Sequence, residues 1–300
     1  MYTTMILGAI AGLSLFLYGM QLMGDGLQKV AGEGLKGIIR KLTKNRFMSV
    51  LVGMFVTTII QSSSATTVMV VGFVNAGLMT LAQAVGVVFG ANVGTTITGQ
   101  MVSFNLSQWA PIVIASGLVA NMLTKNPKVK EASEIFIGFG ILFIGMSSLS
   151  SALQPLKELP EFTNWILQYG SNPFIGVGIG LLMTLVLQSS SATIGVLIAL
   201  ASQGVLPITT AVFIIFGDNI GTCTTALISS LGTSRRGKQV ALFHLMINVI
   251  GTVYFMLFLR GILVNVVESI DPGNVARQIA NAHTIFNIVN VIVLFPFTNL

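Results

Sequence analysis

The sequence predicts an all-α integral membrane protein in which a single membrane domain, residues 1–300, contains two copies of one unit. Composition, an internal repeat and the distribution of basic residues lead to this fold class. Hydrophobic residues make up 53% of the chain and charged residues only 8%, whereas about 25% of the residues of a soluble domain are charged. Apolar stretches close to the roughly 20 residues that span a bilayer recur along the whole chain, so no soluble domain fits between them.

The internal repeat emerges when the chain is compared with itself at an offset of 127 residues. Residues 45–98 then align with residues 172–225 without a gap, with 20 identities in 54 positions. Each copy contains two polar motifs, QSSSATT and GANVGTTIT in the first and QSSSATI and GDNIGTCTT in the second. Weaker similarity at an offset of 126 relates LFLYGM to LFIGM nearer the start of each copy. We therefore expect a first repeat over about 5–124, a second over about 131–260 and an extra C-terminal helix over about 277–297.

The charges of the connecting segments predict that the two repeats enter the membrane from opposite sides. Residues 28–46 carry six Lys and Arg residues against one acid, Glu33, and such an excess marks a cytoplasmic segment. The same rule places the basic segments 125–130 and 235–238 inside, and the less basic segments 103–108 and 154–172 outside. This inverted-topology arrangement is common in secondary transporters, whose substrate sites lie near the bilayer midplane. A parallel duplication is the alternative, and it requires the charge bias to be accidental.

Each QSSS motif is expected at the tip of a re-entrant helical hairpin. Residues 47–60 extend about 21 Å as a helix, which is short of a hydrocarbon core of about 30 Å. The apolar piece after the motif, residues 68–78, is too short to cross as well. Non-helical backbone at this depth must be buried in protein or line a watery cavity, because lipid cannot satisfy its polar groups.

The second motif of each copy, GxNxGT, is expected to break a transmembrane helix. Residues 79–104 are long enough to cross once, and the glycines on either side of Asn92 are poor helix formers. The free N–H groups at such a break favour an anion, and the free carbonyl groups favour a cation.

The four polar motifs are expected to converge in one site of hydroxyl, amide and backbone groups. They contain no Lys or Arg, and Asp218 is their one charged residue. An anion bound there would need cations bound with it, so cation-coupled anion symport follows as a hypothesis. The structural alternative is that these Ser and Thr side chains bond to the preceding helical turn or join helices. For Asp218, the alternative is to accept hydrogen bonds from free N–H groups at the helix break.

The paired motifs resemble the signatures of the type II sodium-phosphate cotransporter family over about residues 5–297. The resemblance implies transport of inorganic phosphate with sodium as the coupling ion and with no other cofactor. The expected sodium ligands are Gln61, Gln188, Asn92, Asp218 and Asn219. The full set of residues expected to bind substrate or sodium is Gln61, Ser62, Ser63, Ser64, Thr66, Asn92, Thr95, Thr96, Gln188, Ser189, Ser190, Ser191, Thr193, Asp218, Asn219 and Thr222.

The chain also departs from the family pattern. Asp218 stands where the first copy has Ala91, which leaves the sodium stoichiometry open. A large disulfide-bearing loop of the mammalian members is missing, which suggests a prokaryotic protein. We expect it in the cytoplasmic membrane, with its C-terminus in the cytoplasm because the last helix is predicted to finish inside. Many bacterial relatives carry a cytoplasmic domain similar to the phosphate-signalling regulator PhoU, and the sequence leaves room for one beyond residue 300. A homodimer is compatible with the sequence.

Other functions are less well supported by the sequence. There is no Walker loop, zincin motif or GxSxG motif, so no enzymatic activity is predicted. The net charge of +6 comes from short loops, where it sets orientation in a membrane and does not indicate nucleic-acid binding. Asp25 with the basic stretch after it predicts an amphipathic surface helix, and His244 and His283 are expected to join helices by hydrogen bonds, a proton relay being the alternative. For the function itself, a phosphate exporter, a transporter of another oxyanion and a non-transporting phosphate sensor remain open.

Overall fold

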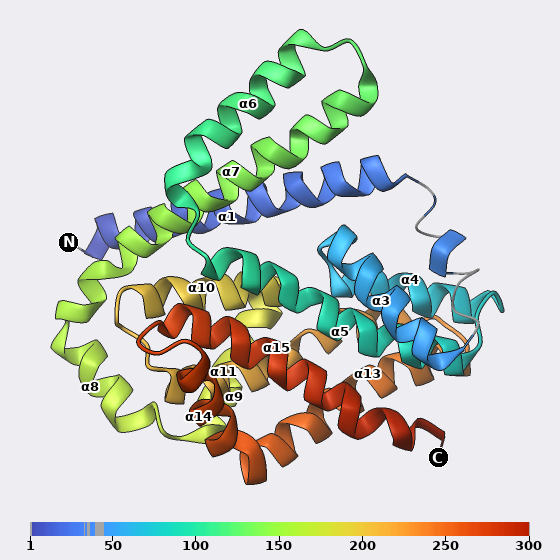
Figure 1. Cartoon of the computed structure of the whole chain (residues 1–300). Helices are drawn as coiled ribbons and strands as arrows, with labels where there is room; N and C mark the ends of the chain where they lie inside the picture. Colours follow the sequence, from blue (N-terminus) through green and yellow to red (C-terminus); the bar gives the residue numbers. More distant parts are fainter. Residues whose placement is uncertain (1, 33, 35–36, 40–44, 300) are drawn as a thin grey trace.

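The computed structural model describes residues 2–32, 34, 37–39 and 45–299, and these form helices without a strand (Figure 1). The all-α fold class is therefore confirmed. Four of the basic residues that predict a cytoplasmic segment, Lys36, Arg40, Lys41 and Lys44, and the acid Glu33, lie outside the described residues. The α-helices are α1 (Tyr2–Ala31), α3 (Arg46–Ile60), α4 (Ser63–Asn75), α5 (Leu81–Ser103), α6 (Ala110–Leu123), α7 (Pro127–Leu153), α8 (Pro160–Tyr169), α9 (Pro173–Leu187), α10 (Ser190–Ser202), α11 (Ile208–Gly221), α12 (Cys223–Ser230), α13 (Arg235–Tyr254), α14 (Arg260–Ile270) and α15 (Val275–Leu294).

Six helical stretches of the described chain are long and apolar enough to cross a membrane. They are Tyr2–Ala31, Leu81–Ser103, Pro127–Glu158, Ile208–Ser230, Arg235–Ile270 and Val275–Thr298. Some of these stretches join labelled helices through short segments: η2 (Gln154–Glu158) extends α7, and η3 (Phe255–Leu259) connects α13 to α14. The extra C-terminal helix expected over about 277–297 corresponds to α15.

Helices α1 and α7 pack closely and in opposite directions through reciprocal glycine contacts. A Cβ at Gly19 would lie 2.2 Å from the backbone nitrogen of Leu142, and a Cβ at Gly145 would lie 2.2 Å from that of Phe16. These two contacts exchange roles at an offset of 126 residues, and a second pair does the same: Gly12 against Leu149 and Gly138 against Met23. Residue numbers rise along α1 as they fall along α7, so the two equivalent helices are antiparallel and related by a local twofold axis.

The two QSSS motifs have the same backbone geometry. Gln61 ends α3 in the left-handed conformation with φ 58° and ψ 23°, and Gln188 ends α9 with φ 52° and ψ 23°. The residue after each Gln is extended and caps the next helix. Each motif therefore joins two short helices, α3 to α4 and α9 to α10, through one tight turn. A hydroxyl pair ties each turn together: Thr57 with Thr66 at 2.9 Å and Thr184 with Thr193 at 3.0 Å.

The predicted helix break at GANVGTT is wrong for the first repeat, because α5 continues through the motif from Leu81 to Ser103. In the second repeat, Thr222 separates α11 from α12 but keeps helical angles, φ −58° and ψ −26°. The glycines serve close packing between helices. A Cβ at Gly90 would lie 2.0 Å from the carbonyl oxygen of Val50 in α3, and a Cβ at Gly217 would lie 1.9 Å from that of Val177 in α9. A helical glycine costs only about 1 kcal/mol relative to alanine, so contacts of this kind can offset it.

Helices α4 and α10, which follow the two QSSS turns, end at opposite ends of the molecule (Figure 1). At the end of α4, Asn75 accepts a hydrogen bond from the backbone N–H of Ser234, just before α13 begins. From there α13 and α14, which form the stretch Arg235–Ile270, lead to the other end of the molecule (Figure 1). The end of α10 lies there, because Gly204 shares a cavity with Gly273 and Asn274.

Helix α15 completes the core beside the polar motifs. It packs against α5, α10 and α11, and the ring of Phe286 lies 5.1 Å from that of Phe216 in α11 and 4.8 Å from that of Phe255. This packing buries His283 and Asn287 of α15 next to the second GxNxGT motif. Helix α6 packs along α7, and Figure 1 shows this pair projecting beyond α1.

Candidate substrate-binding site

A cavity of about 420 Å³ lies where the two QSSS turns meet, and we refer to it as the tip cavity. The two turns come from sequence positions 127 residues apart, and the second half of α1 forms a further wall. The lining residues are Met20, Gln21, Gly24, Asp25, Gln28, Ile60, Gln61, Ser62, Ser63, Ser64, Ala65, Thr95, Gln188, Ser189, Ser190 and Ser191.

The start of one helix from each turn faces the tip cavity. The hydroxyl of Ser62 accepts a hydrogen bond from the N–H of Ala65, and the hydroxyl of Ser189 does the same for Ala192. These caps satisfy one N–H group of each helix. The first two N–H groups of each helix keep no partner within the described chain, and they belong to Ser63, Ser64, Ser190 and Ser191. Two helix N-termini with free N–H groups are a favourable environment for an anion.

The described lining of the tip cavity carries a negative charge. Among the residues that the structure describes, Asp25 is the one charged residue of this lining, and no Lys or Arg belongs to it. The C-terminal ends of α3 and α9 lie in the same turns, and a helix C-terminus presents carbonyl oxygens and the negative end of the helix dipole. The hydroxyl of Thr95 is buried without a hydrogen-bond partner in the described chain. The cavity therefore combines N–H donors for an anion with oxygen atoms for cations.

The two glutamines at the turns have different surroundings. Each amide nitrogen donates to a carbonyl of its own helix, from Gln61 to Thr58 and from Gln188 to Leu185, both at 2.5 Å. The side-chain oxygen of Gln61 also accepts a hydrogen bond of 2.6 Å from Thr98 in α5. The equivalent Thr225 donates to the carbonyl of Thr222 instead, which leaves the Gln188 oxygen exposed at the cavity.

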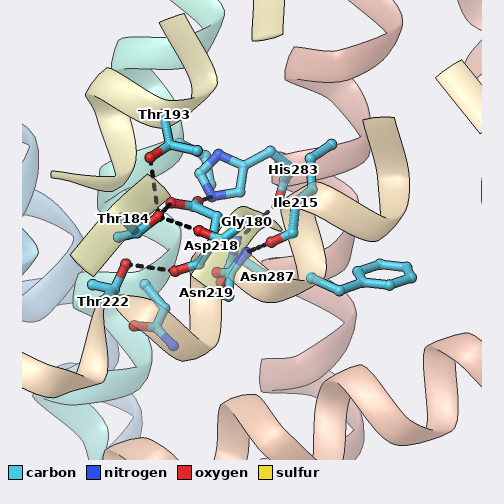
Figure 2. A network of polar contacts seen from close by, with 12 residues as sticks. Gly180, Thr184, Thr193, Ile215, Asp218, Asn219, Thr222, His283 and Asn287 are labelled. Atoms are coloured by element: carbon cyan, nitrogen blue, oxygen red, sulfur yellow. Dashed lines mark hydrogen bonds and ion pairs between the residues drawn. The ribbon is translucent and has the colours of Figure 1, made fainter. Parts of the chain in front are cut away.

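Asp218 lies behind the second turn in a fully buried network (Figure 2). The hydroxyl of Thr184 donates to Asp218 Oδ1 at 2.6 Å and lies 3.0 Å from the hydroxyl of Thr193. Asp218 Oδ2 has no hydrogen-bond partner in the described chain and lies 4.0 Å from Nε2 of His283. A buried carboxylate without compensation costs several kcal/mol. The group is therefore either protonated or accompanied by a cation.

The corresponding position of the first repeat is Ala91, and its neighbour Asn92 belongs to a different network. The Asn92 side chain donates to Asn248 and its oxygen lies 3.0 Å from Nε2 of His244. Asn248 in turn donates to the sulfur of Cys223 at 3.1 Å. Helix α13 thus satisfies the amide of the first GxNxGT motif. The expectation that His244 joins helices by a hydrogen bond agrees with this contact.

The structure divides the expected site residues into two groups. The residues that line the tip cavity are Gln61, Ser62, Ser63, Ser64, Thr95, Gln188, Ser189, Ser190 and Ser191. Those that lie outside its lining, in the packing between helices, are Thr66, Asn92, Thr96, Thr193, Asp218, Asn219 and Thr222. Asn219 donates to the carbonyl of its own helix at Ile215. Within the described residues no group of three or more His, Cys, Asp or Glu could hold a metal ion.

Sequence reasoning missed the contribution of α1 to the cavity. Asp25 was expected on an amphipathic surface helix, but it belongs to the long helix Tyr2–Ala31 and lines the tip cavity with Gln21 and Gln28. The available signal was the weak repeat at offset 126, which includes α1 in the duplicated unit. Thr184 was missed as well, although it is identical to Thr57 in the aligned repeats.

Together these features define a class, a multi-pass helical membrane protein in which two equivalent helical turns share one polar cavity. The Na+/Pi-cotransporter family profile matches residues 15–151 and 145–270, and the chain belongs to this family. This is a family of transporters, not of enzymes, and membership indicates phosphate transport. The family resemblance of the motifs is thus confirmed.

Several relatives support this assignment. The chain is 30% identical to the "Uncharacterized protein YqeW" of Bacillus subtilis over 285 residues, which are 95% of this chain and 92% of the relative. It is 23% identical to the "Putative inorganic phosphate export protein YjbB" of Escherichia coli over 294 residues, 98% of this chain and 54% of that protein. The chain thus spans about half the length of the latter. It is also 37% identical to "Sodium-dependent phosphate transport protein 2A" of Rattus norvegicus over 102 residues, 32% of this chain and 16% of the relative. No solved structure matches the chain.

Proposed function

We propose that the protein is a secondary active transporter that moves inorganic phosphate together with sodium by alternating access, with the tip cavity as the binding site. One observation carries this proposal: two equivalent helix N-termini present free N–H groups to one cavity, whose lining among the described residues has no basic side chain. A phosphate oxygen can accept from such N–H groups, and each helix dipole contributes about 0.3–2 kcal/mol to binding an anion. The family membership indicates which anion.

Coupling to sodium follows from the charge of the cavity. A phosphate bound beside Asp25 would add negative charge to a cavity that is already negative, so it needs cations bound at the same time. Sodium ions can bind the oxygen atoms of the turns and of the Gln61 and Gln188 side chains. The ion and the anion then stabilise each other, which is the basis of symport.

Asp218 is a further candidate ligand for sodium in this proposal, together with Asn92 and Asn219. Its unpartnered oxygen lies in the packing between helices and not in the tip cavity, so a cation there would lie deeper than the phosphate. The structural role, in which Asp218 accepts a hydrogen bond from Thr184, is the competing explanation. An ionisable group inside a membrane domain is expensive, which favours a functional role.

Inverted topology in the membrane is part of the same proposal. The antiparallel packing of the equivalent helices α1 and α7 supports it, as does the separation of the ends of α4 and α10. If the membrane normal runs along these helices, each QSSS unit is a re-entrant hairpin that begins and ends on one face. Phosphate would then reach the tips alternately from the two faces.

The direction of transport has a second candidate. The similarity to a protein named for phosphate export covers 98% of this chain, and this favours export as the alternative to import. Transport of another oxyanion and a sensor without transport are also compatible with a cavity that binds an anion.

Transport in proteoliposomes tests the proposal. We expect uptake of labelled phosphate to depend on an inward sodium gradient, and efflux from preloaded vesicles to depend on an outward one. The comparison of both directions distinguishes import from export. The variant Ser63→Ala with Ser190→Ala, which loses two hydroxyls and keeps the N–H groups, should lower the flux while remaining folded, and normal sodium and phosphate affinities in it would show that these hydroxyls are not ligands. Phosphate binding without flux in the unmodified protein would establish a sensor instead.

Thiol labelling tests the topology. In a Cys223→Ser background, single cysteines at Lys41 and Lys128 should be protected from an impermeant reagent added outside, whereas a cysteine at Glu158 should react. The opposite labelling pattern would overturn the inverted arrangement.

A further inference from the structure

A second, larger cavity of about 760 Å³ lies at the other end of α10, and we refer to it as the distal cavity. Ser190 and Ser191 at the start of α10 line the tip cavity, whereas Ala201 and Ser202 at its end line the distal cavity. Eleven residues of helix, roughly 16 Å, separate Ser191 from Ser202. The ends of α5 and α10, the second half of α7, Lys157 and the start of α15 line the distal cavity.

The face of α7 that lines the distal cavity is equivalent, in the other repeat, to the face of α1 that lines the tip cavity. Helix α1 contributes five residues to the tip cavity, and four of them have counterparts at offset 126 on α7 that line the distal cavity. The fifth, Gln28, corresponds to Gln154, which lies outside this lining. The pairs are Met20 with Met146, Gln21 with Ser147, Gly24 with Ser150 and Asp25 with Ser151. Because α1 and α7 are antiparallel, these faces belong to cavities at opposite ends of the molecule. The distal cavity is thus a repeat-related feature and not an incidental hollow.

The two cavities differ in charge at matched positions. Where the tip cavity has Asp25, the distal cavity has Ser151, and Lys157 is the one charged residue among the described residues of its lining. Lys157 makes no ion pair within the described chain. Nearby, Arg277 and Asp271 compensate each other, with 3.8 Å between Nε and Oδ2. The positive charge of Lys157 is therefore left uncompensated at the cavity.

Hydrogen-bond donors accompany this charge. Ser147, Ser150 and Ser151 lie on one face of α7, and their hydroxyls make no hydrogen bond within the described chain. Ser103 and Ser202, in contrast, donate to carbonyls of their own helices. Three unpaired hydroxyls next to an unpaired ammonium group match a ligand with several acceptor oxygens and negative charge.

We propose that the distal cavity is a second oxyanion-binding site, in which Lys157 supplies the charge and the hydroxyls of Ser147, Ser150 and Ser151 donate to the oxygens of a phosphate group. The inference rests on the proposed function for the choice of phosphate as the ion. The distal cavity lies at the opposite end of α10 from the tip cavity, so a phosphate bound there would be held before it reaches the tip cavity or after it leaves. The phosphate group can belong to the free ion or to a lipid headgroup, and the experiment separates the two.

Cysteine protection tests the site without requiring transport. The protein is purified in detergent with Cys223→Ser and Ser151→Cys, and the labelling rate is measured with an anionic and with a cationic methanethiosulfonate reagent. A unit charge about 4 Å from the reacting thiol contributes about 1 kcal/mol in water, which changes the local concentration of a charged reagent about fivefold. Lys157→Gln should therefore lower the ratio of the anionic to the cationic labelling rate by at least that factor. Lys157→Arg should keep the ratio. A cysteine at exposed Ser269, outside the cavity lining, should show no change and serves as the matched control.

Inorganic phosphate is then added at concentrations up to those that saturate transport. Protection of Ser151→Cys, lost in Lys157→Gln and absent at Ser269→Cys, would support a site for the free ion. Protection by phosphatidylglycerol nanodiscs but not by inorganic phosphate would identify a headgroup as the source of the phosphate. If neither protects, or if Lys157→Gln leaves protection unchanged, the site is refuted. Flux of labelled phosphate through the unmodified protein is measured separately, so a failure of the proposed function remains distinguishable.

Discussion

The two QSSS turns have nearly the same backbone but different neighbours. Gln61 and Gln188 share their left-handed angles, and both following helices begin with a serine cap. Yet Thr98 holds the side chain of Gln61, whereas the oxygen of Gln188 has no such partner. Behind the second turn, Asp218 accepts a hydrogen bond from Thr184, whereas the first repeat has Ala91 at the position of Asp218. The helix starts, which both turns share, suit binding of the anion. The side chains that differ between the turns suit a difference in cation binding.

The largest effect is expected from removing the free N–H groups that the two turns share. Proline at the first helical position lacks the N–H but fits a helix start, and the extended backbone of the preceding Ser62 or Ser189 suits a following proline. Ser63→Pro and Ser190→Pro should therefore each weaken phosphate affinity about 10- to 100-fold, the equivalent of one hydrogen bond to a charged group. The phosphate dependence of uptake measures this.

Alanine at the same positions is the control for the hydroxyl. Ser63→Ala and Ser190→Ala keep the N–H, so we expect a smaller loss of affinity than with proline. Equal losses in the alanine and proline variants would show that the hydroxyl binds phosphate and that the backbone does not.

Substitution of the equivalent glycines Gly90 and Gly217 by alanine should destabilise both repeats to a similar extent. Gly90→Ala and Gly217→Ala place a methyl group about 2 Å from a carbonyl oxygen of the neighbouring helix, and overpacking of this kind costs about 1–3 kcal/mol or more. Thermal unfolding in detergent should shift down by several degrees in both variants. Gly178→Ala, with no atom within 4 Å of the added methyl, is the control. A large shift in one repeat alone would mean that the two helix pairs are not equivalent.

The sequence predicted the duplicated helical fold because the lengths of the apolar stretches, the excess of basic residues in some loops and the internal repeat can be recognised without the structure. It predicted the wrong conformation at GANVGTT, since the glycines could signal either a break or a close helix contact. The distance between Gly90 and Val50 that decides between them exists only in the folded protein. Asp25 was missed for a similar reason: its place at the tip cavity depends on how α1 packs against the first QSSS turn, where Gly24 lies next to Ile60 and Gln61. The QSSS turns were recognisable because each packs a polar sequence between apolar helices.

The aligned polar motifs of the two repeats differ in charge at Asp218, whose counterpart is Ala91. If it binds sodium, Asp218→Asn should raise the half-saturating sodium concentration about tenfold or more, as expected for loss of a charged ligand. Phosphate affinity at saturating sodium should change little. Each sodium ion supplies about 3.7 kcal/mol with a tenfold gradient and 100 mV, so loss of one ion would lower the accumulation limit several hundredfold. Unchanged sodium dependence and an unchanged ratio of charge to phosphate would assign Asp218 to structure alone.

The threonines at the two turns provide a matched comparison of stability. Thr184→Val removes the donor to Asp218 Oδ1 and leaves a buried oxygen unpaired, which costs about 1–3 kcal/mol. Thr57→Val removes only a hydroxyl pair with Thr66 and should cost about 1 kcal/mol. Thermal unfolding of the two variants measures the difference. If Thr57→Val is the more destabilising, the Asp218 network does not stabilise the second repeat.

The smallest effect is expected at the hydrogen bond that distinguishes the two glutamines. Thr98→Val frees the oxygen of Gln61, so the first turn comes to resemble the second, at a cost of about 1 kcal/mol. Because a freed amide oxygen can bind a cation, the sodium dependence of transport should shift by up to about fivefold, which is the equivalent of that energy. Thr225→Val, which removes only a contact to the carbonyl of Thr222, should leave sodium dependence unchanged. If both variants shift it equally, the hydrogen bond to Gln61 does not account for the difference between the two turns.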